Sequence, residues 1–266
     1  MTFIAKKSLG QNFLVNSHYR NKILEACCLG PDDIVLEIGP GRGALTFELA
    51  KRVKKVIAVE VDDELFAWLS QQQADSNIEF IHQSILDFPL DRLPEGTIVV
   101  SNLPYNIATP IIERILACRN RIKKFYMTVQ LEYGQRIVAS PGSKKYGSFS
   151  CFVQYYASTR FLFKIPPAAF RPVPKVYSCF LCLNISPSKG HAQKDEDFLF
   201  RLIRTAFQQR RKKLANALCA IMSKDDMEKI LLQTEIPLDF RAESVSLEQY
   251  MQIAVRAQQG MDSQRD

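Results

Sequence analysis

The chain of 266 residues has little histidine and no long apolar run: it contains three histidines and one tryptophan. Because histidine is the commonest metal ligand in proteins, so few of them argue against a zinc site, and we expect no metal cofactor. No apolar stretch approaches the roughly 20 residues that span a bilayer. The first residues, MTFIAKKSLGQNFL, also lack the apolar core of a secretory signal. We therefore expect a cytoplasmic protein with no membrane partner.

The cysteines do not form the pattern of a disulfide framework. There are seven, an odd number, and Cys27 and Cys28 are neighbours in an apolar helical stretch. Cys179 and Cys182 lie three residues apart in an expected strand, which points them to opposite faces. Reduced thiols in an intracellular protein fit this pattern.

Composition is that of a globular protein, with 47 % hydrophobic and 24 % charged residues. The length favours one large domain and one small one. The net charge of +7 is a modest lean toward polyanions such as nucleic acid, and it is weak evidence alone. The basic residues are clustered, for example Arg210-Arg211-Lys212-Lys213.

Apolar runs with strand character alternate with amphipathic helical stretches, which predicts a doubly wound α/β fold with a parallel sheet. Strands are expected over 33–38, 55–62, 77–86 and 96–105, and helices over 17–30, 44–53, 63–74 and 109–120. Residues 122–139 run from a strand into a helix. The segments 149–165 and 176–185 are rich in Phe, Tyr and Val, and we expect both to be strands.

A polar stretch, SPSKGHAQKDED, predicts a linker at residues 186–197. After it, residues 198–222, 225–234 and 246–259 all have helical periodicity. We therefore expect a catalytic domain over 1–190 and a small all-α domain over 195–266.

The stretch LEIGPGRGALT follows the first expected strand and contains Gly39 and Gly41. Glycines there let the chain turn sharply and let a ligand approach the backbone. Glu60, about 20 residues on, ends the next strand, where a carboxylate can accept from both ribose hydroxyls. Glu37 would repel a pyrophosphate, and Pro40 removes a backbone donor. A cationic nucleoside without phosphate, such as S-adenosylmethionine (SAM), therefore fits better than a dinucleotide.

The fourth expected strand ends in Asn102-Leu103-Pro104-Tyr105, at the same sheet edge as the glycine turn and Glu60. An exocyclic amine on a base is a poor nucleophile, because its lone pair is delocalised into the ring. The Asn102 side-chain oxygen and a main-chain carbonyl, that of Leu103, would draw its N–H groups out of the ring plane. Tyr105 would stack on the base. A capped turn with a core tyrosine is the structural alternative.

Five stretches together resemble a known family. KKSLGQNFL, VLEIGPGRGALT, VEVD, NLPYNIATP and FRPVPKVYS occur in this order. They are similar to the ribosomal RNA adenine N6,N6-dimethyltransferases of the KsgA type, which act on the small subunit. The resemblance covers nearly the whole chain. It implies a Rossmann-like class I SAM-dependent methyltransferase domain followed by a small helical domain that contacts RNA or the ribosome.

The resemblance also implies roles for individual residues. Asn12 and Leu14 would contribute to the SAM pocket, together with Gly39, Gly41, Glu60 and Asn102. Asn102 and Leu103 would face the methyl donor and the target amine. Tyr105 would stack on one face of the target adenine, and Phe170 would close over the other.

Two positions depart from the family pattern. The family usually has an Asp that accepts from the cofactor adenine after the third strand, and Ser84 stands there in this chain. We expect Ser84 to accept a hydrogen bond from the cofactor without the charge, and Asp87, three residues later, is the alternative acceptor. Tyr177 stands where Asp is more usual.

The family resemblance implies a substrate of two adjacent adenosines in a hairpin near the 3′ end of small-subunit (16S) rRNA, within a partly assembled 30S subunit. The protein would act as a monomer. Cations that could meet RNA phosphates are Lys6 and Lys7, the RNRIKK stretch at 119–124, Lys144 and Lys145, Arg171 and Lys175, and residues 210–213.

Two other functions compete with this reading. A non-catalytic assembly or RNA-binding factor could have the same fold, but it would not need an intact Asn102-Leu103-Pro104-Tyr105 turn. A nicotinamide-dependent oxidoreductase could use the glycine turn, but Glu37 and Pro40 disfavour it.

Overall fold

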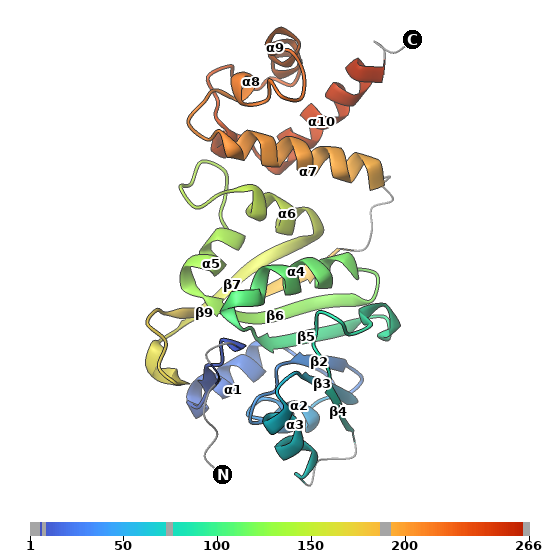
Figure 1. Cartoon of the computed structure of the whole chain (residues 1–266), viewed down its shortest axis with the longest axis vertical. Coiled ribbons are helices and arrows are strands. Elements are labelled where there is room, and N and C mark those ends of the chain that lie inside the picture. Colours follow the sequence, from blue (N-terminus) through green and yellow to red (C-terminus); the bar gives the residue numbers. More distant parts are fainter. Residues whose placement is uncertain (1–5, 7–8, 73–76, 187–192, 263–266) are drawn as a thin grey trace. The chain divides into compact units, whose positions relative to one another are not determined.

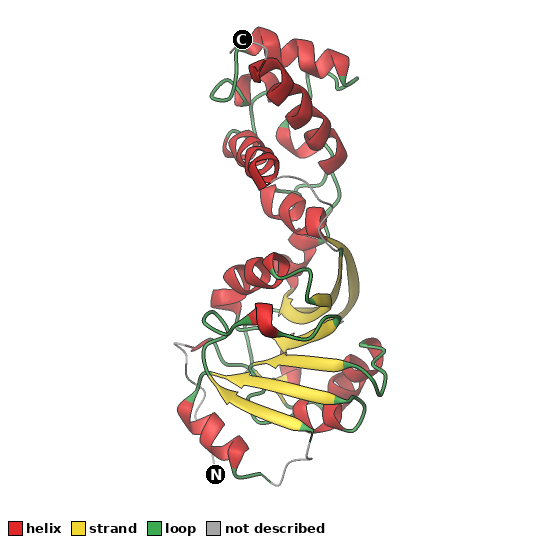
Figure 2. Cartoon of the chain, turned by 90° about the vertical axis from the view of Figure 1, so that its right-hand side faces the viewer, coloured by secondary structure: helices red, strands yellow, loops and turns green. Residues whose placement is uncertain are grey.

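The computed structural model of the chain describes residues 6, 9–72, 77–186 and 193–262. Its residues form two compact units. The first comprises Met1–Gly134 and Tyr156–Pro187, and the second comprises Gln135–Tyr155 and Ser188–Asp266. Figures 1 and 2 show the elements of each unit.

The first unit is built on a mixed sheet (Figure 1). Its order is β4 (Ile78–His82), β3 (Lys55–Glu60), β2 (Ile34–Ile38), β5 (Thr97–Asn102), β6 (Ile122–Gln130), β9 (Ser178–Ile185) and β7 (Ala157–Ile165). In this order, β4, β3, β2, β5 and β6 are parallel to one another. Strand β9 is antiparallel to both of its neighbours, β6 and β7. The doubly wound α/β fold is confirmed, and the sheet differs from the expected all-parallel one at β9.

Helices flank both faces of this sheet (Figure 2). They are α1 (Ser17–Ala26), α2 (Thr46–Ala50), α3 (Asp63–Ser70) and α4 (Ala108–Ala117), with 3-10 turns η2 (Leu90–Arg92), η3 (Tyr105–Ile107) and η4 (Pro167–Ala169). Because both faces are covered, the central strands are continuously apolar: Val35, Leu36, Val99 and Val100 are fully buried. A short antiparallel ribbon pairs β1 (Phe13–Leu14) with β8 (Phe170–Arg171).

The second unit is helical. It contains α6 (Ser148–Tyr156), α7 (Gln193–Gln208), α8 (Leu214–Ala217), α9 (Lys224–Gln233), η5 (Ala242–Ser244) and α10 (Leu247–Asp262), and α5 (Leu131–Ile137) spans the boundary. Helix α7 packs against α8 and α10. The expected C-terminal helices are therefore present.

One predicted strand is wrong. Residues 149–165 do not form one strand, because α6 ends at Tyr156 and only β7 is extended. Phe152 and Tyr155 are three residues apart, so they share one helix face, and both rings lie 5.3 Å from that of Phe200 in α7. These contacts between rings far apart in the sequence stabilise a helix where local β propensity predicts a strand.

The division into units also differs from the expected domains at one segment. We expected residues 1–190 to form a single domain, but Gln135–Tyr155 group with the C-terminal helices. The aromatic contacts of α6 with α7 account for this grouping. The expected linker at 186–197 falls partly outside the described residues, and α7 begins within it, at Gln193.

All seven cysteines are free thiols. Across the described part of the chain, no helix has the length and apolar character needed to cross a lipid bilayer. The same residues contain no group of three or more His, Cys, Asp or Glu side chains placed to hold a metal ion.

Candidate functional site: a pocket at the carboxyl edge of the sheet

The ends of three parallel strands meet at one pocket. In the register of β2 with its neighbours, Ile38 lies beside Val59 of β3 and Ser101 of β5, so the three strands end at the same level. The next residues along each strand, Gly39, Glu60 and Asn102, all line the pocket, and the segment 9–15 lines it from the N-terminal side. The edge predicted from the sequence is therefore where a ligand would bind.

The glycine turn adopts a backbone that other residues rarely adopt. Gly39 and Gly41 have φ values of +67° and +58°. A Cβ at Gly39 would meet no atom within 4 Å, so this backbone is open to the pocket. A Cβ at Gly41 would lie 3.1 Å from the Phe13 ring. At Gly39 the bare backbone therefore faces the pocket, and at Gly41 it lies against Phe13 of the N-terminal segment.

Glu60 is held in place by backbone donors. Its Oε1 accepts from the N–H groups of Val61 at 2.9 Å and Asp62 at 3.0 Å, and its Oε2 accepts from Gly41 at 3.1 Å. Burial raises the pKa of this carboxyl, and the three N–H donors oppose that shift. A carboxylate offers about four lone-pair positions, so one remains for a ribose hydroxyl.

Glu37 is a fully buried carboxyl that lines the same pocket, and its Oε2 has no hydrogen-bond partner within the usual geometry among the described residues. Burial raises its pKa to about 8, the Thr46 hydroxyl opposes this shift, and the nearby Glu60 charge adds to the rise. An unpartnered buried acceptor is costly unless a ligand supplies a donor. This site therefore suits a ligand with an N–H donor or a positive charge.

The Asn102-Leu103-Pro104-Tyr105 turn is fixed at each residue that the sequence singled out. The Asn102 Nδ2 donates to the Asn12 carbonyl at 2.7 Å, and the Leu103 N–H donates to the Thr128 carbonyl at 3.1 Å. The Tyr105 hydroxyl bonds to that of Ser178 at 2.8 Å. Because Asn102 lines the pocket and its amide nitrogen already donates to Asn12, its oxygen is the atom of this amide that remains to accept from a ligand.

The N-terminal segment completes the wall. Asn12 and Leu14 line the pocket, and β1 is held by its pairing with β8 and by a bond from the Val15 N–H to the Ala169 carbonyl. The structure thus brings together most of the predicted site residues, which are Asn12, Leu14, Gly39, Gly41, Glu60, Asn102, Leu103 and Tyr105.

Two predicted site residues lie outside the lining. The Phe170 ring is fully buried in the hydrophobic core next to β1. The Ser84 hydroxyl accepts from the Leu86 N–H at 3.2 Å within its own turn, and its neighbours Gln83 and Ile85 line the pocket instead. In this conformation neither side chain reaches the pocket.

Sequence reasoning missed the residues that hold the wall, Gln11 and Asp62. The Gln11 side chain donates to Asp62 Oδ2 at 2.8 Å. An Asp directly before an apolar helical stretch is a helix N-cap signal, so Asp62 was detectable as a cap. No local pattern indicates its bond to Gln11, 51 residues away.

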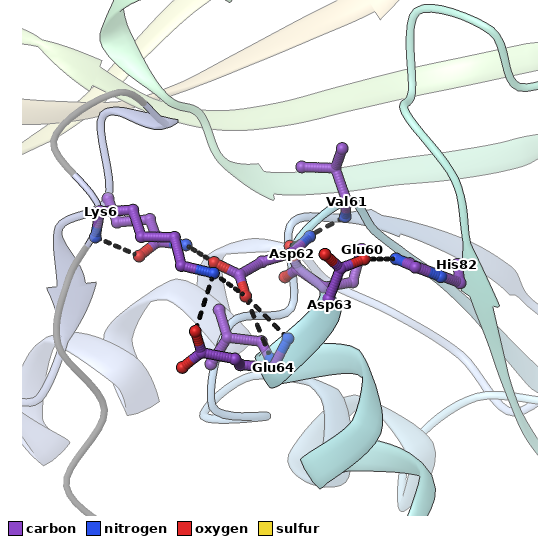
Figure 3. Close-up of polar contacts among 9 residues, drawn as sticks. Lys6, Glu60, Val61, Asp62, Asp63, Glu64 and His82 are labelled. Carbon is purple, nitrogen blue, oxygen red and sulfur yellow. Dashed lines mark hydrogen bonds and ion pairs between the residues drawn. The ribbon is translucent and has the colours of Figure 1, made fainter.

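Several cations expected at RNA are engaged within the protein. Lys6 pairs with Asp62 at 3.0 Å and Glu64 at 3.2 Å (Figure 3). Arg121 and Lys123 pair with Glu95 and Asp33 at 3.1 and 2.9 Å. Lys7 lies outside the described residues. The Lys6 ammonium therefore has carboxylate partners already.

Other basic residues are exposed. In the first unit these are Arg171 and Lys175, and in the second they are Lys144, Lys145, Arg211, Lys212 and Lys213. Arg210 is tied to Glu243 at 3.1 Å. The cluster 210–213 thus contains one arginine in an ion pair and three exposed cations.

A Rossmann-like sheet with a glycine turn, a carboxylate at the end of the next strand and an Asn-Leu-Pro-Tyr turn at one edge is typical of SAM-dependent methyltransferases. Residues 2–259 match the family model described as "Ribosomal RNA adenine dimethylase". The chain belongs to this family of rRNA adenine dimethyltransferase enzymes, as the sequence motifs predicted.

Curated relatives agree. The chain is 40 % identical over 264 residues to "Ribosomal RNA small subunit methyltransferase A" of Moorella thermoacetica, covering 94 % of this chain and 92 % of that protein. It is 39 % identical over 258 residues to the protein of the same name from Caldanaerobacter subterraneus subsp. tengcongensis, covering 94 % and 96 %.

Solved structures share the fold. A dimethyladenosine transferase from Plasmodium falciparum superposes with a TM-score of 0.82 at 22 % identity, covering 93 % of this chain and 98 % of that one. The 23S rRNA methyltransferase ErmE superposes with a TM-score of 0.73 at 25 % identity, covering 93 % and 100 %.

Proposed function

We propose that this chain transfers methyl groups from SAM to N6 of two adjacent adenosines in a hairpin near the 3′ end of small-subunit rRNA, giving N6,N6-dimethyladenosine. The observation that carries the proposal is the Asn102 amide. Its nitrogen donates to the Asn12 carbonyl, so its oxygen remains to accept from a ligand in a pocket that is also lined by Glu60 and the glycine turn. Family membership and the names of the curated relatives support the same reaction.

The pocket residues fit SAM. Glu60 would accept from one ribose hydroxyl, and the unpartnered Glu37 oxygen would take a donor from the cationic part of the ligand. Gly39 would let that part approach the backbone. When bound, SAM supplies an electrophilic methyl group. The residues of this chain bind the ligand, orient it and keep it at the carboxyl edge of the sheet.

Asn102 and Leu103 would act on the acceptor. The Asn102 oxygen and the Leu103 carbonyl accept from the two amine N–H groups, which draws the nitrogen lone pair out of the ring. With SAM bound, the nitrogen would form a bond to the methyl carbon while the carbon–sulfur bond breaks, and the resulting ammonium would lose its proton to water. Holding the two reactants in line supplies much of the rate.

Tyr105 would stack on the target base, which must leave its helix to reach the pocket. Phe170 would cover the second face of the base. For this its ring must leave the core position that it occupies without substrate. Ser84 would contact the cofactor adenine only after a similar change in its turn.

The wider setting is also part of the proposal. The substrate would be rRNA within a partly assembled small subunit, met by a monomer in the cytoplasm, as a step in subunit biogenesis. Exposed cations of both units, among them Lys175 and Arg211, would neutralise phosphates.

The test has two arms. The melting temperature of the purified chain is measured with SAM and with NAD, and tritiated SAM is then incubated with small subunits from cells that lack the modification. We expect stabilisation by SAM alone and label in the rRNA. Stabilisation by NAD but not SAM would indicate the oxidoreductase instead.

A further inference from the structure

We propose that Asp62 is a positioning residue that connects the cofactor side of the pocket to the acceptor side. This inference deepens the proposed function and rests on it. The side chain of Asp62 is only 2 % exposed, and it lies just beyond the carboxyl end of β3. It does not line the pocket itself, so any effect on the reaction must pass through its neighbours.

Toward the cofactor side, Asp62 fixes Glu60. The Asp62 N–H donates to Glu60 Oε1 at 3.0 Å. Its own Oδ1 accepts from the N–H groups of Glu64 and Leu65 at 3.0 and 3.3 Å, which caps α3. The cap holds the backbone after β3 in the conformation that turns the Asp62 N–H toward Glu60 (Figure 3).

Toward the acceptor side, Asp62 holds the N-terminal segment. Its Oδ2 accepts from the Gln11 side chain at 2.8 Å, and Oδ1 accepts from Lys6 Nζ at 3.0 Å. The Gln11 Oε1 in turn accepts from the Lys6 N–H at 2.8 Å. The next residue, Asn12, receives the Asn102 amide through its carbonyl at 2.7 Å. Asp62 is therefore connected to Asn102 through one main-chain segment, the one that contains Gln11 and Asn12.

The two oxygens of Asp62 accept from different donors, so the connection between Asp62 and Gln11 can be tested separately from the helix cap. Among the described residues, Oδ1 accepts from the two helix-cap N–H groups and from Lys6, and Oδ2 accepts only from Gln11. In Asp62→Asn the amide oxygen stays at the cap, where two backbone donors require an acceptor. The new NH2 then faces the NH2 of Gln11, so two donors oppose each other.

Exchanging the polarity should repair this contact. In Gln11→Glu alone, a carboxylate faces the Asp62 carboxylate. In the double variant Asp62→Asn with Gln11→Glu, the amide of residue 62 donates to the carboxylate of residue 11, which still accepts from the Lys6 N–H. Each single variant should weaken SAM binding about tenfold, as losing a charge-assisted hydrogen bond does. The double variant should bind within about threefold of the wild type, whereas independent effects would multiply.

The matched control is Asp63→Asn, the same chemical change one residue along. Asp63 is 88 % exposed and pairs with His82 at 3.0 Å (Figure 3). We expect its SAM affinity to equal that of the wild type.

A second readout needs no cofactor. The side-chain amide resonances of Asn102 in ligand-free protein should shift in Asp62→Asn and stay unchanged in Asp63→Asn. Asn is as good an N-cap as Asp, so α3 is retained. If Asp62→Asn nevertheless fails to fold, Gln11→Leu, which caps no helix, should produce the same shift of the Asn102 signals.

The outcomes separate this inference from the proposed function. Wild-type protein that does not bind SAM would contradict the proposed function and this inference with it. Wild-type binding with unchanged Asn102 signals in the Asp62 or Gln11 variants would overturn the inference alone. A double variant that binds as weakly as the product of the two single effects would also overturn it.

Discussion

Asn102 carries an acceptor and a donor on one side chain, and the structure uses them differently. The donor holds the N-terminal wall through Asn12, and the acceptor is left to the pocket. In the proposed reaction, Asn102 would both hold the wall of the cofactor site and accept from the target amine. This dual use explains why the strand ends in an amide where a plain strand-to-helix turn would not need one.

Replacing Asn102 by Ala should therefore affect the chemical step more than SAM binding. We expect kcat to fall about 100-fold or more, in the range found when an oriented polar group is removed from a reacting centre. SAM affinity should fall only several-fold, about the effect of the lost bond to Asn12. Single-turnover methyl transfer and calorimetric SAM titration measure the two separately. Equal losses in both would contradict a role in the transition state.

Glu37 should make SAM binding depend on pH. Its pKa of about 8 is above the ordinary value, so the folded, ligand-free protein keeps this proton at neutral pH while an unfolded chain has lost it. The resulting stability is present at low pH and declines as pH rises toward about 8. A cationic ligand favours the carboxylate, so SAM binding at pH 7 should release roughly one proton.

Calorimetry in two buffers of different ionisation enthalpy measures this release. Glu37→Gln should abolish it. The matched control is Glu48→Gln. Glu48 lies in α2, is partly exposed and pairs with Lys51, so its replacement should leave the proton release unchanged. Proton release that persists in Glu37→Gln would assign the titration to another group.

At the scale of the element, the order of residues in the sequence predicts which side chains lie at the carboxyl ends of the strands. Gly39, Glu60 and Asn102 were predictable because each lies at the end of a largely apolar stretch, and parallel strands bring such positions to one edge. The orientation of Phe170, Ser84 and Lys6 was not predictable in this way. Each depends on contacts with residues far along the chain or on a turn that closes on itself.

The α6 segment shows the same limit for secondary structure. Its Phe and Tyr residues have high β propensity, but the helix places Phe152 and Tyr155 on one face against Phe200. Propensity is overridden because this packing buries large rings that a strand would point to opposite sides.

Removing the Phe200 ring should therefore destabilise the helical unit. Phe200 is 8 % exposed, and Phe200→Ala should reduce the free energy of unfolding by about 3 kcal/mol. The control Leu232→Ala, at a residue 64 % exposed in the same unit, should change it by less than about 0.5 kcal/mol. Denaturant unfolding followed by circular dichroism measures both. A neutral Phe200→Ala would contradict the aromatic packing of α6 on α7.

For the whole molecule, the described basic residues divide into those that form ion pairs with carboxylates and those that form none with the described residues, whatever their exposure. Arg210 belongs to the first group, and Arg211, Lys212 and Lys213 belong to the second. Only the second group has cations ready to neutralise phosphates without breaking an ion pair.

Changing Arg211, Lys212 and Lys213 together to Ala should weaken binding to small subunits and lower its salt dependence. Each lost phosphate contact reduces the slope of log K against log salt by about 0.7 to 0.9. The control changes Lys224 and Lys229 of the same unit to Ala. These lysines form ion pairs with Glu228 and Asp226 of α9. Filter binding over a salt series compares the two. An unchanged slope in the triple variant would exclude these cations as RNA contacts.

The most direct test of the account is the identity and position of the product. Unmodified small subunits are incubated with the protein and SAM, and the rRNA is digested and analysed by mass spectrometry. The account predicts N6,N6-dimethyladenosine at two adjacent positions near the 3′ end, and its loss with Asn102→Ala. Unmethylated rRNA, despite measurable binding of both SAM and subunits, would contradict the account and favour a non-catalytic assembly factor.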